Sequence, residues 1–224
     1  MRLLRRILLI GFLLMLLLAG VGLWVWYGIG QTPTFYADLA VTAEKRAAAE
    51  EDCKRMTRKV LQLRNQMNRQ GAWSIEMTQD ELNHWIALEL EEKHPGFISR
   101  RILQPRGEIL GEKIRAGATI DAREFQGVAS VEVIPSLEGP NIINIEFLRI
   151  QAGIVPLPRK ILLDFATEKA REYALPIQWR QSHGNPVLRV VLNEQEFRVH
   201  GRPQVLERLE VGDGKIVLEG KCLE

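Results

Sequence analysis

Residues 73–81, Trp-Ser-Ile-Glu-Met-Thr-Gln-Asp-Glu, show how this chain combines strands with helices. Three apolar residues alternate with polar ones at the start, which predicts a strand with one buried face. Thr78 and Glu81 then have the spacing of a capping box, in which a hydroxyl and a carboxylate bond the backbone N–H groups at a helix start. The segment therefore predicts a strand that runs directly into a helix. The apolar face of that helix would consist of Leu82, Trp85, Ile86, Leu88 and Leu90.

From about residue 102 onward, short runs of alternating apolar and polar residues predict a series of strands. Turn residues separate them, notably Gly127, the segment 136–140 and Asp213-Gly214, the last of which predicts a hairpin. Strands that come in clusters joined by short turns favour an antiparallel α+β domain over a parallel α/β domain. The strands are expected around 114–120, 131–133, 143–147, 187–192, 197–200, 205–211 and 215–221.

A second amphipathic helix is predicted between these strands. Pro156-Leu-Pro158 marks its start, because a proline in the first helical turn loses no hydrogen bond. Leu175-Pro176 marks its end. Its apolar face would consist of Ile161, Leu162, Phe165, Ala166 and Ala170. The predicted α+β domain, residues 71–224, is thus an antiparallel sheet covered by two amphipathic helices.

Residues 7–29 form an uncharged run of 23 residues, most of them Leu, Ile, Val, Phe or Trp. At a helical rise of about 1.5 Å per residue this run crosses a hydrocarbon core of roughly 30 Å. Three arginines lie in residues 1–6, and the next charge is Asp38. The positive-inside rule then places residues 1–6 in the cytoplasm and the large domain in the periplasm. The sequence predicts a single-pass signal-anchor in the inner or plasma membrane.

Cleavage of a signal peptide near Ala19-Gly20 is the alternative to an uncleaved anchor. The apolar run is longer than the 7–15 residues, roughly, of a signal peptide. Trp24, Trp26 and Tyr27 also fall at the level of the outer headgroups, where aromatic side chains gather in membrane helices. Both features favour the anchor.

Residues 30–70 are predicted to form a linker and a stalk helix. Residues 37–69 contain no Gly or Pro and are rich in good helix formers. A 3-4-3-4 spacing gives this helix one apolar stripe, which either packs back on the domain or forms a homodimer. The stripe consists of Cys53, Met56, Val60, Leu63 and Met67.

The charge distribution argues against a nucleic-acid partner. Residues 37–70 hold eight Lys or Arg and five Asp or Glu, whereas residues 71–224 hold nineteen and twenty-three. The body of the protein is therefore net acidic, while nucleic-acid-binding domains are basic. The basic excess next to the predicted anchor would attract anionic headgroups.

Cys53 and Cys222 are the only cysteines. They could form one disulfide in an oxidising compartment, or Cys53 could serve as a small buried apolar residue of the stripe. Two isolated cysteines and four scattered histidines lack the spacing of metal ligands. No metal or cofactor is therefore predicted.

Three segments resemble parts of the YpmS-like family of membrane-anchored bacterial proteins. They are the strand and capped helix at 73–86, with its Thr-x-x-Glu-Leu-Asn pattern, the Gly-x-x-Pro-Leu-Pro passage at 153–158, and the closing hairpin at 209–220. Such proteins are similar to tubular lipid-binding (BPI-like) domains, in which a curved sheet wraps a helix beside an apolar groove. The helix at 37–70 is additional to the family pattern. The resemblance implies a ligand-lining seam formed by Leu82, Trp85 and Ile86 on one helix and by Ile161, Leu162 and Phe165 on the other.

The sequence favours a non-catalytic protein. Ser182 and His183 are adjacent in a predicted turn, and neighbouring side chains rarely form a nucleophile–base pair. No phosphate-binding glycine loop is present. The expected function is binding of a lipid or another apolar ligand in the cell envelope. The alternative is a scaffold of a membrane complex that dimerises or docks through the stalk helix.

Overall fold

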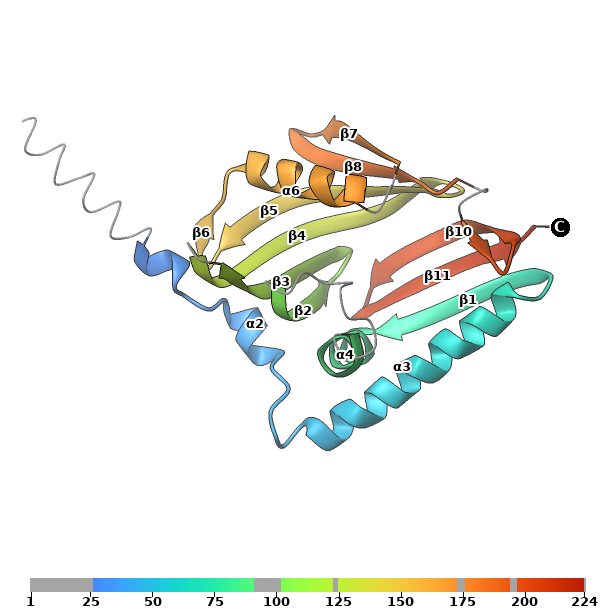
Figure 1. Ribbon diagram of the computed structural model, residues 1–224, viewed down its shortest axis with the longest axis horizontal. Coiled ribbons are helices and arrows are strands. Elements are labelled where there is room, and N and C mark those ends of the chain that lie inside the picture. The colour runs from blue at the N-terminus through green and yellow to red at the C-terminus, as the bar shows by residue number, and fades with distance from the viewer. Residues whose placement is uncertain (1–25, 91–101, 123–124, 173–175, 194–196, 224) are drawn as a thin grey trace, which may run out of the picture.

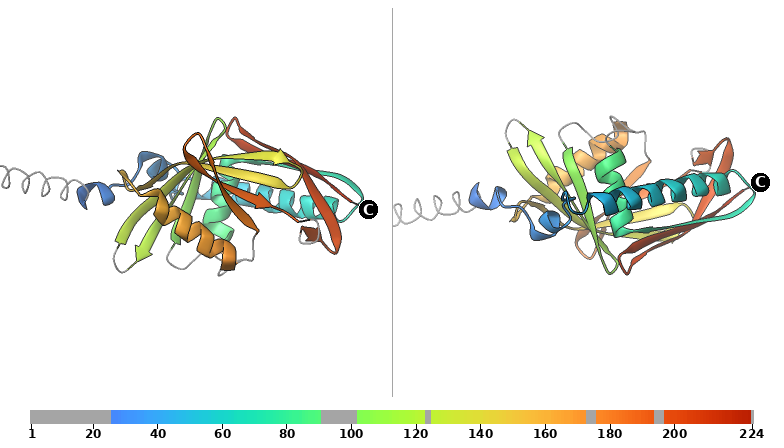
Figure 2. Two further views of the ribbon diagram at one scale, coloured as in Figure 1. Left: turned by 90° about the horizontal axis from the view of Figure 1, so that it is seen from above. Right: turned by 90° about the horizontal axis from the view of Figure 1, so that it is seen from below.

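Two antiparallel sheets and the helices that pack on them form the described part of the chain (Figure 1). The computed structural model describes residues 26–90, 102–122, 125–172, 176–193 and 197–223. The predicted α+β class with a curled antiparallel sheet is confirmed. Figure 2 shows how strongly the long strands twist.

The helical segments are α2 (Thr34–Asp38), α3 (Arg46–Met67), α4 (Gln79–Trp85), the π-helical turn η1 (Ile86–Leu90) and α6 (Arg159–Glu172). The strands are β1 (Gly71–Thr78), β2 (Ile102–Leu110), β3 (Lys113–Ala122), β4 (Phe125–Gly139), β5 (Ile142–Ala152), β6 (Val155–Pro156), β7 (Ile177–Ser182), β8 (Asn185–Val191), β9 (Arg198–Val199), β10 (Arg202–Gly212) and β11 (Lys215–Cys222).

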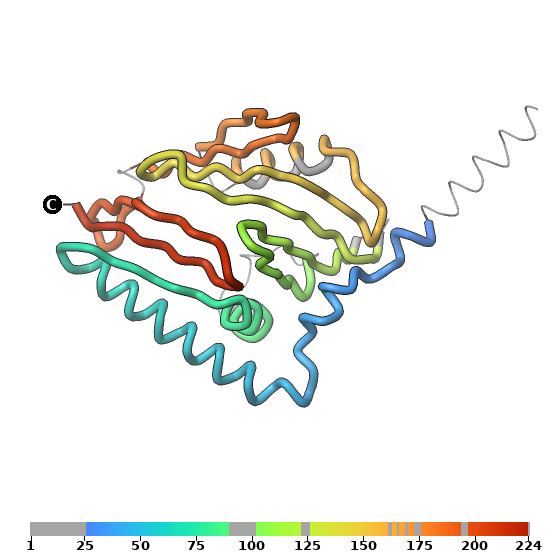
Figure 3. Tube along the Cα trace, turned by 180° about the vertical axis from the view of Figure 1, so that it is seen from behind, coloured from blue at the N-terminus to red at the C-terminus, as the bar shows by residue number. Residues whose placement is uncertain are grey.

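The smaller sheet has the strand order β1-β11-β10-β9, and the larger one β2-β3-β4-β5-β8-β7, with β6 paired to β5. The smaller sheet joins distant parts of the chain, because β1 pairs with the C-terminal strand and Trp73 lies opposite Gly220 (Figure 3). The larger sheet is built mainly from hairpins between consecutive strands. Its face is covered by α6, which Trp179 of β7 holds by donating from Nε1 to Thr167 Oγ1 at 2.9 Å.

Two predicted turns differ from those observed. The sequence predicts turns at Gly127 and at 136–140, but β4 runs through Gly127 and on to Gly139. The chain turns at Pro140–Asn141, at the end of the second predicted segment. Gly127 pairs with Ile120 of β3, and a bulge lies between Leu137 and Gly139. Strand pairing, with β3 at Gly127 and with β5 at 136–139, outweighs the local turn preference of these residues.

The capping box predicted at the start of α4 is confirmed. Thr78 Oγ1 accepts from the Glu81 N–H at 3.3 Å, and Glu81 Oε2 accepts from the Thr78 N–H at 3.0 Å. The buried Asn83 amide bonds both backbone groups of Gly107 in β2, at 2.6 and 2.7 Å. The Thr-x-x-Glu-Leu-Asn pattern therefore starts α4 and fastens it to the larger sheet.

The main core lies where α3 and the two sheets meet. Met67, Trp73 and Leu206 are buried there, and Leu137 and Ile143 of the larger sheet pack against them. Phe197 stacks edge-on to Trp73 with ring centroids 6.5 Å apart. The two sheets thus share one core at this end of the molecule.

Helix α3 lies along α4 and β1, and its apolar stripe faces them in part. Cys53, Met56 and Met67 are buried, Leu63 is half-buried and Val60 is 38% exposed. The predicted packing of this helix on its own domain is therefore present. A homodimer through α3 stays a prediction, and it would have to use the exposed Val60 and Leu61.

The continuous helix predicted from residue 37 is wrong at its start. The chain forms α2 at 34–38 and begins α3 only at residue 46. Phe35 and Tyr36 are buried against Val128 of β4, so that packing on the larger sheet turns the chain away from the axis of α3. Tertiary packing here outweighs helix propensity.

The predicted anchor at 7–29 lies largely outside the described residues, as does the predicted end of the helix after residue 90. In the ranges that the structure describes, none of the helices has both the length and the apolar character needed to cross a bilayer.

Candidate functional site

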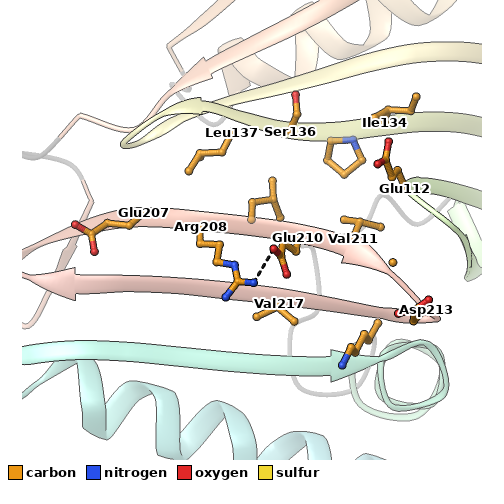
Figure 4. Close-up of a pocket in the computed structure, with 14 residues that line it drawn as sticks. Glu112, Ile134, Ser136, Leu137, Glu207, Arg208, Glu210, Val211, Asp213 and Val217 are labelled. Atoms are coloured by element: carbon orange, nitrogen blue, oxygen red, sulfur yellow. Dashed lines mark hydrogen bonds and ion pairs between the residues drawn. The ribbon is translucent and has the colours of Figure 1, made fainter.

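A groove of about 640 Å³ lies between the two sheets, where β4 runs beside β10 (Figure 4). We call it the β4–β10 groove. The side chains and backbone that line it are Glu112, Ile134, Pro135, Ser136, Leu137, Glu207, Arg208, Leu209, Glu210, Val211, Gly212, Asp213, Lys215 and Val217.

The groove exists because two strand edges lack a neighbour among the described strands. β3 pairs with β4 only up to the match of Ile114 with Val133, so that in the described chain residues 134–139 pair with β5 alone. Within the described residues, β9 pairs with β10 only at 202–203, which leaves 208–212 paired with β11 alone and Glu207 in a bulge. Backbone groups of a strand point in the sheet plane toward its neighbours, so the unpaired groups of both strands face the gap.

Asn141 closes one end of the groove by joining the two sheets. Its backbone N–H donates to Leu206 O at 3.1 Å, and its side-chain Oδ1 accepts from the Leu206 N–H at 2.7 Å. Asn141 is buried and has a φ of +62°. At the other end lie the tips of two hairpins, which carry Glu112 and Asp213 (Figure 4).

Half-buried apolar side chains line both sides of the groove. Ile134, Pro135 and Leu137 come from β4, and Leu209 and Val211 come from β10. Val217 of β11, which pairs with Glu210, also lines the groove. An elongated apolar ligand would therefore contact apolar side chains on both walls.

The charged residues around the groove leave it net acidic. Arg208 bonds Glu210 at 2.6 Å and Glu219 at 3.1 Å, and these two carboxylates raise the pKa of its guanidinium. Lys215 bonds Glu76 at 3.1 Å. Both cations of the lining are thus paired with carboxylates, and the acidic lining residues outnumber them. Such a rim repels anionic groups.

The predicted seam between two helices remains untested. Leu82, Trp85 and Ile86 are half-buried at α4 and η1, whose main neighbours are α3, β1 and β2. Ile161, Leu162 and Phe165 lie in α6, but their side chains fall outside the described part of the structure.

A cluster of charged side chains between α3 and α4 was not predicted. The buried Glu81 carboxylate bonds Lys59 Nζ at 2.6 Å, Asp52 lies 2.8 Å from His84 Nδ1, and Arg55 bonds Asp52. The bonds between α3 and α4 join residues 22 to 32 positions apart, so that local spacing signals only the Asp52–Arg55 pair within α3. Burial alone would raise the pKa of Glu81, but the bonds from Lys59 and Thr78 outweigh burial, and the pKa lies below its ordinary value.

We expect Glu81→Gln to lower the free energy of unfolding by about 1 to 2 kcal/mol at pH 7. Glutamine keeps the capping-box acceptor but loses the charge that Lys59 and Arg55 contact. Because folding lowers the pKa of Glu81, its contribution is present above the ordinary value of 4.5 and is lost as the pH falls through the lower folded pKa. Denaturant unfolding of both proteins between pH 7 and pH 3 measures this difference.

The matched control is Glu76→Gln, which removes an exposed carboxylate bonded to Lys215. It should change stability by less than about 0.5 kcal/mol. A gap between wild type and Glu81→Gln that stays the same from pH 7 to pH 3 would contradict the assigned role of the Glu81 charge.

The other reactive residues form no recognisable catalytic arrangement in the described chain. Ser182 Oγ lies 3.0 Å from His183 Nδ1 on an exposed turn. Cys53 and Cys222 are both buried, and no disulfide joins them. Among the described residues, no group of three or more His, Cys, Asp or Glu side chains could hold a metal ion.

Neither a family model nor a curated protein nor a solved structure matches this chain. The resemblance to YpmS-like and BPI-like proteins therefore stays a prediction.

Proposed function

We propose that this chain is a non-catalytic, membrane-anchored envelope protein that binds the acyl chain of a lipid in the β4–β10 groove. The observation that carries the proposal is a groove of about 640 Å³ with apolar side chains on both walls. Ligand sites in proteins commonly measure about 300 to 1,000 Å³. Six charged residues of the lining accompany the six apolar ones, so the groove combines apolar walls with a charged rim.

A lipid carrier needs an apolar surface that excludes water from the acyl chain, and it needs no reactive group. Each CH₂ of an acyl chain buried against Leu209, Val211 and Ile134 would contribute about 0.8 kcal/mol. The paired cations and net-acidic rim disfavour an anionic headgroup there. The preferred ligand is therefore a lipid with a neutral or zwitterionic headgroup.

The apolar run at 7–29 supplies the anchor in this proposal, with residues 1–6 in the cytoplasm and the domain in the periplasm. Helices α4 and α6 would serve as the covers of the curved sheet. We place the ligand in the groove rather than between these helices, because residues of two sheets visibly converge on the groove (Figure 4).

Strand addition is the second candidate function. The unpaired edges of β4 and β10 could accept an extended peptide, which would bond the backbone groups that a lipid leaves to water. Pro135 weighs against it, because a proline removes a backbone donor from the short open segment of β4.

A scaffold that dimerises through α3 is the remaining alternative. The exposed Val60 and Leu61 are adjacent on that helix. They form a small surface, while the rest of the apolar stripe is already covered by α4 and β1.

Native mass spectrometry of the full chain released from membranes, followed by organic extraction, tests these functions. We expect an added mass that extracts as a lipid. A bound peptide mass would favour strand addition instead, and a ligand-free dimer would favour the scaffold. A ligand-free monomer would contradict lipid binding.

A further inference from the structure

The end of the N-terminal segment is fastened to the larger sheet by backbone bonds. Gly28 O accepts from the Ile154 N–H at 3.0 Å, in the turn between β5 and β6. Gly153 precedes it with a φ of +59°, and its N–H donates to Val128 O at 2.7 Å. The turn and residues 28–31 touch so closely that a Cβ on Gly153 would lie 2.2 Å from Gly28 O.

The following segment is fixed as well. The Tyr36 hydroxyl donates to Gln104 O at 2.9 Å, and Arg106 donates to Tyr36 O at 2.6 Å while lying over the tyrosine ring. A Cβ on Gly117 of β3 would lie 3.1 Å from the ring of Phe35. The chain between residue 28 and α2 is therefore held by the domain at both ends and does not act as a loose tether.

Large apolar side chains remain exposed around this attachment. Trp26 is 82% exposed, Tyr27 is 70% exposed and Ile154 is 46% exposed. Figure 1 shows residues 26–29 next to β6, which directly follows Ile154. Residues 7–25, directly before them, carry no charge.

We propose that Trp26, Tyr27 and Ile154 form one surface that sits in the headgroup layer of the membrane and holds the domain in a fixed orientation. The inference rests on the membrane anchor of the proposed function. Chain continuity selects the occupant, since the apolar run that reaches Trp26 brings the bilayer to this end of the domain. Tryptophan and tyrosine are the residues that favour the headgroup layer. Ile154 belongs to the same surface, because its backbone N–H donates to Gly28 O and so holds it close to Trp26 and Tyr27.

The test places a fluorescent probe on Ile154→Cys in the full chain, reconstituted in phosphatidylcholine vesicles that contain doxyl-labelled phosphatidylcholine. Cys53 and Cys222 are both buried, so that an added surface thiol can be labelled selectively. Leu61→Cys is the matched control, because Leu61 is 54% exposed on α3. We expect quenching by the doxyl lipid at least threefold stronger at position 154 than at position 61.

A second pair of variants tests the attachment. Gly153→Ala should reduce the quenching at position 154 to that at position 61, because the added methyl pushes the turn from residues 28–31. Gly111→Ala introduces the same strain at a φ of +56° with open space around it, and should change nothing. Unchanged quenching in Gly153→Ala would overturn the role of the attachment.

Equal quenching at positions 154 and 61 in a chain that resists carbonate extraction would overturn the surface itself. This comparison does not depend on whether Gly153→Ala folds. If carbonate extracts the chain from the vesicles, both the surface and its anchor are overturned. Lipid binding by the groove is measured separately by mass spectrometry.

Discussion

Gly220→Ala is expected to lower the free energy of unfolding by about 3 kcal/mol or more. Gly220 lies in β11 between β1 and β10, opposite Trp73 and Leu206. A Cβ at this position would lie 2.0 Å from Val205 O and 2.3 Å from the Trp73 ring. The backbone contact cannot be relieved by a side-chain rotation, so the strand or the buried tryptophan has to move.

Thermal unfolding measures the effect, which corresponds to a fall in Tm of roughly 6 to 12 °C for a chain of this size. The matched control is Gly212→Ala in β10, where a Cβ meets nothing within 4 Å. That variant should unfold within about 2 °C of wild type. An equal Tm for Gly220→Ala and wild type would show that Trp73 does not pack over Gly220 as described.

Asn141→Ala is expected to cost about 2 to 4 kcal/mol. The variant leaves the buried N–H of Leu206 without its acceptor and puts alanine at a φ of +62°. Since Asn141 joins the two sheets at the end of the β4–β10 groove, its loss should also loosen the groove. Urea unfolding gives the free energy, and amide hydrogen exchange at Leu206 reports the local opening.

Two further variants separate strain from hydrogen bonding. Asp213→Ala removes an exposed side chain at a φ of +51° and should cost about 1 kcal/mol through strain. Asn141→Gly relieves the strain but still lacks the acceptor, and should therefore remain less stable than wild type by 1 to 3 kcal/mol, roughly. If Asn141→Gly matches wild type, the side-chain bond between the sheets contributes nothing.

Local signals predicted most individual elements. The capping box at Thr78 and Glu81, the start of α6 after Pro158 and the hairpin at Asp213-Gly214 all depend on residues within a few positions of each other. In that hairpin both residues have a positive φ, as the turn type requires. These elements are confirmed because no distant contact competes with them.

The groove could not be predicted from the sequence, because it depends on where distant strands stop pairing. Nothing near β4 indicates that β3 pairs with it only up to Val133, and nothing near β10 indicates that β9 is short. The role of Asn141 was missed for a related reason. The segment 136–140 has turn composition, yet bonds to β5 extend β4 to Gly139 and move the turn onto Asn141.

The retention of a lipid by groove variants tests the proposed function most directly. Native mass spectrometry of the full chain compares wild type with Leu209→Lys, which places a charge on the apolar wall, and with Leu61→Lys, the same change on exposed α3. If the groove binds the lipid, wild type and Leu61→Lys should carry the same extractable lipid, and Leu209→Lys should lose affinity by about tenfold, or about 1.4 kcal/mol. Equal lipid retention by all three proteins would contradict binding in the β4–β10 groove.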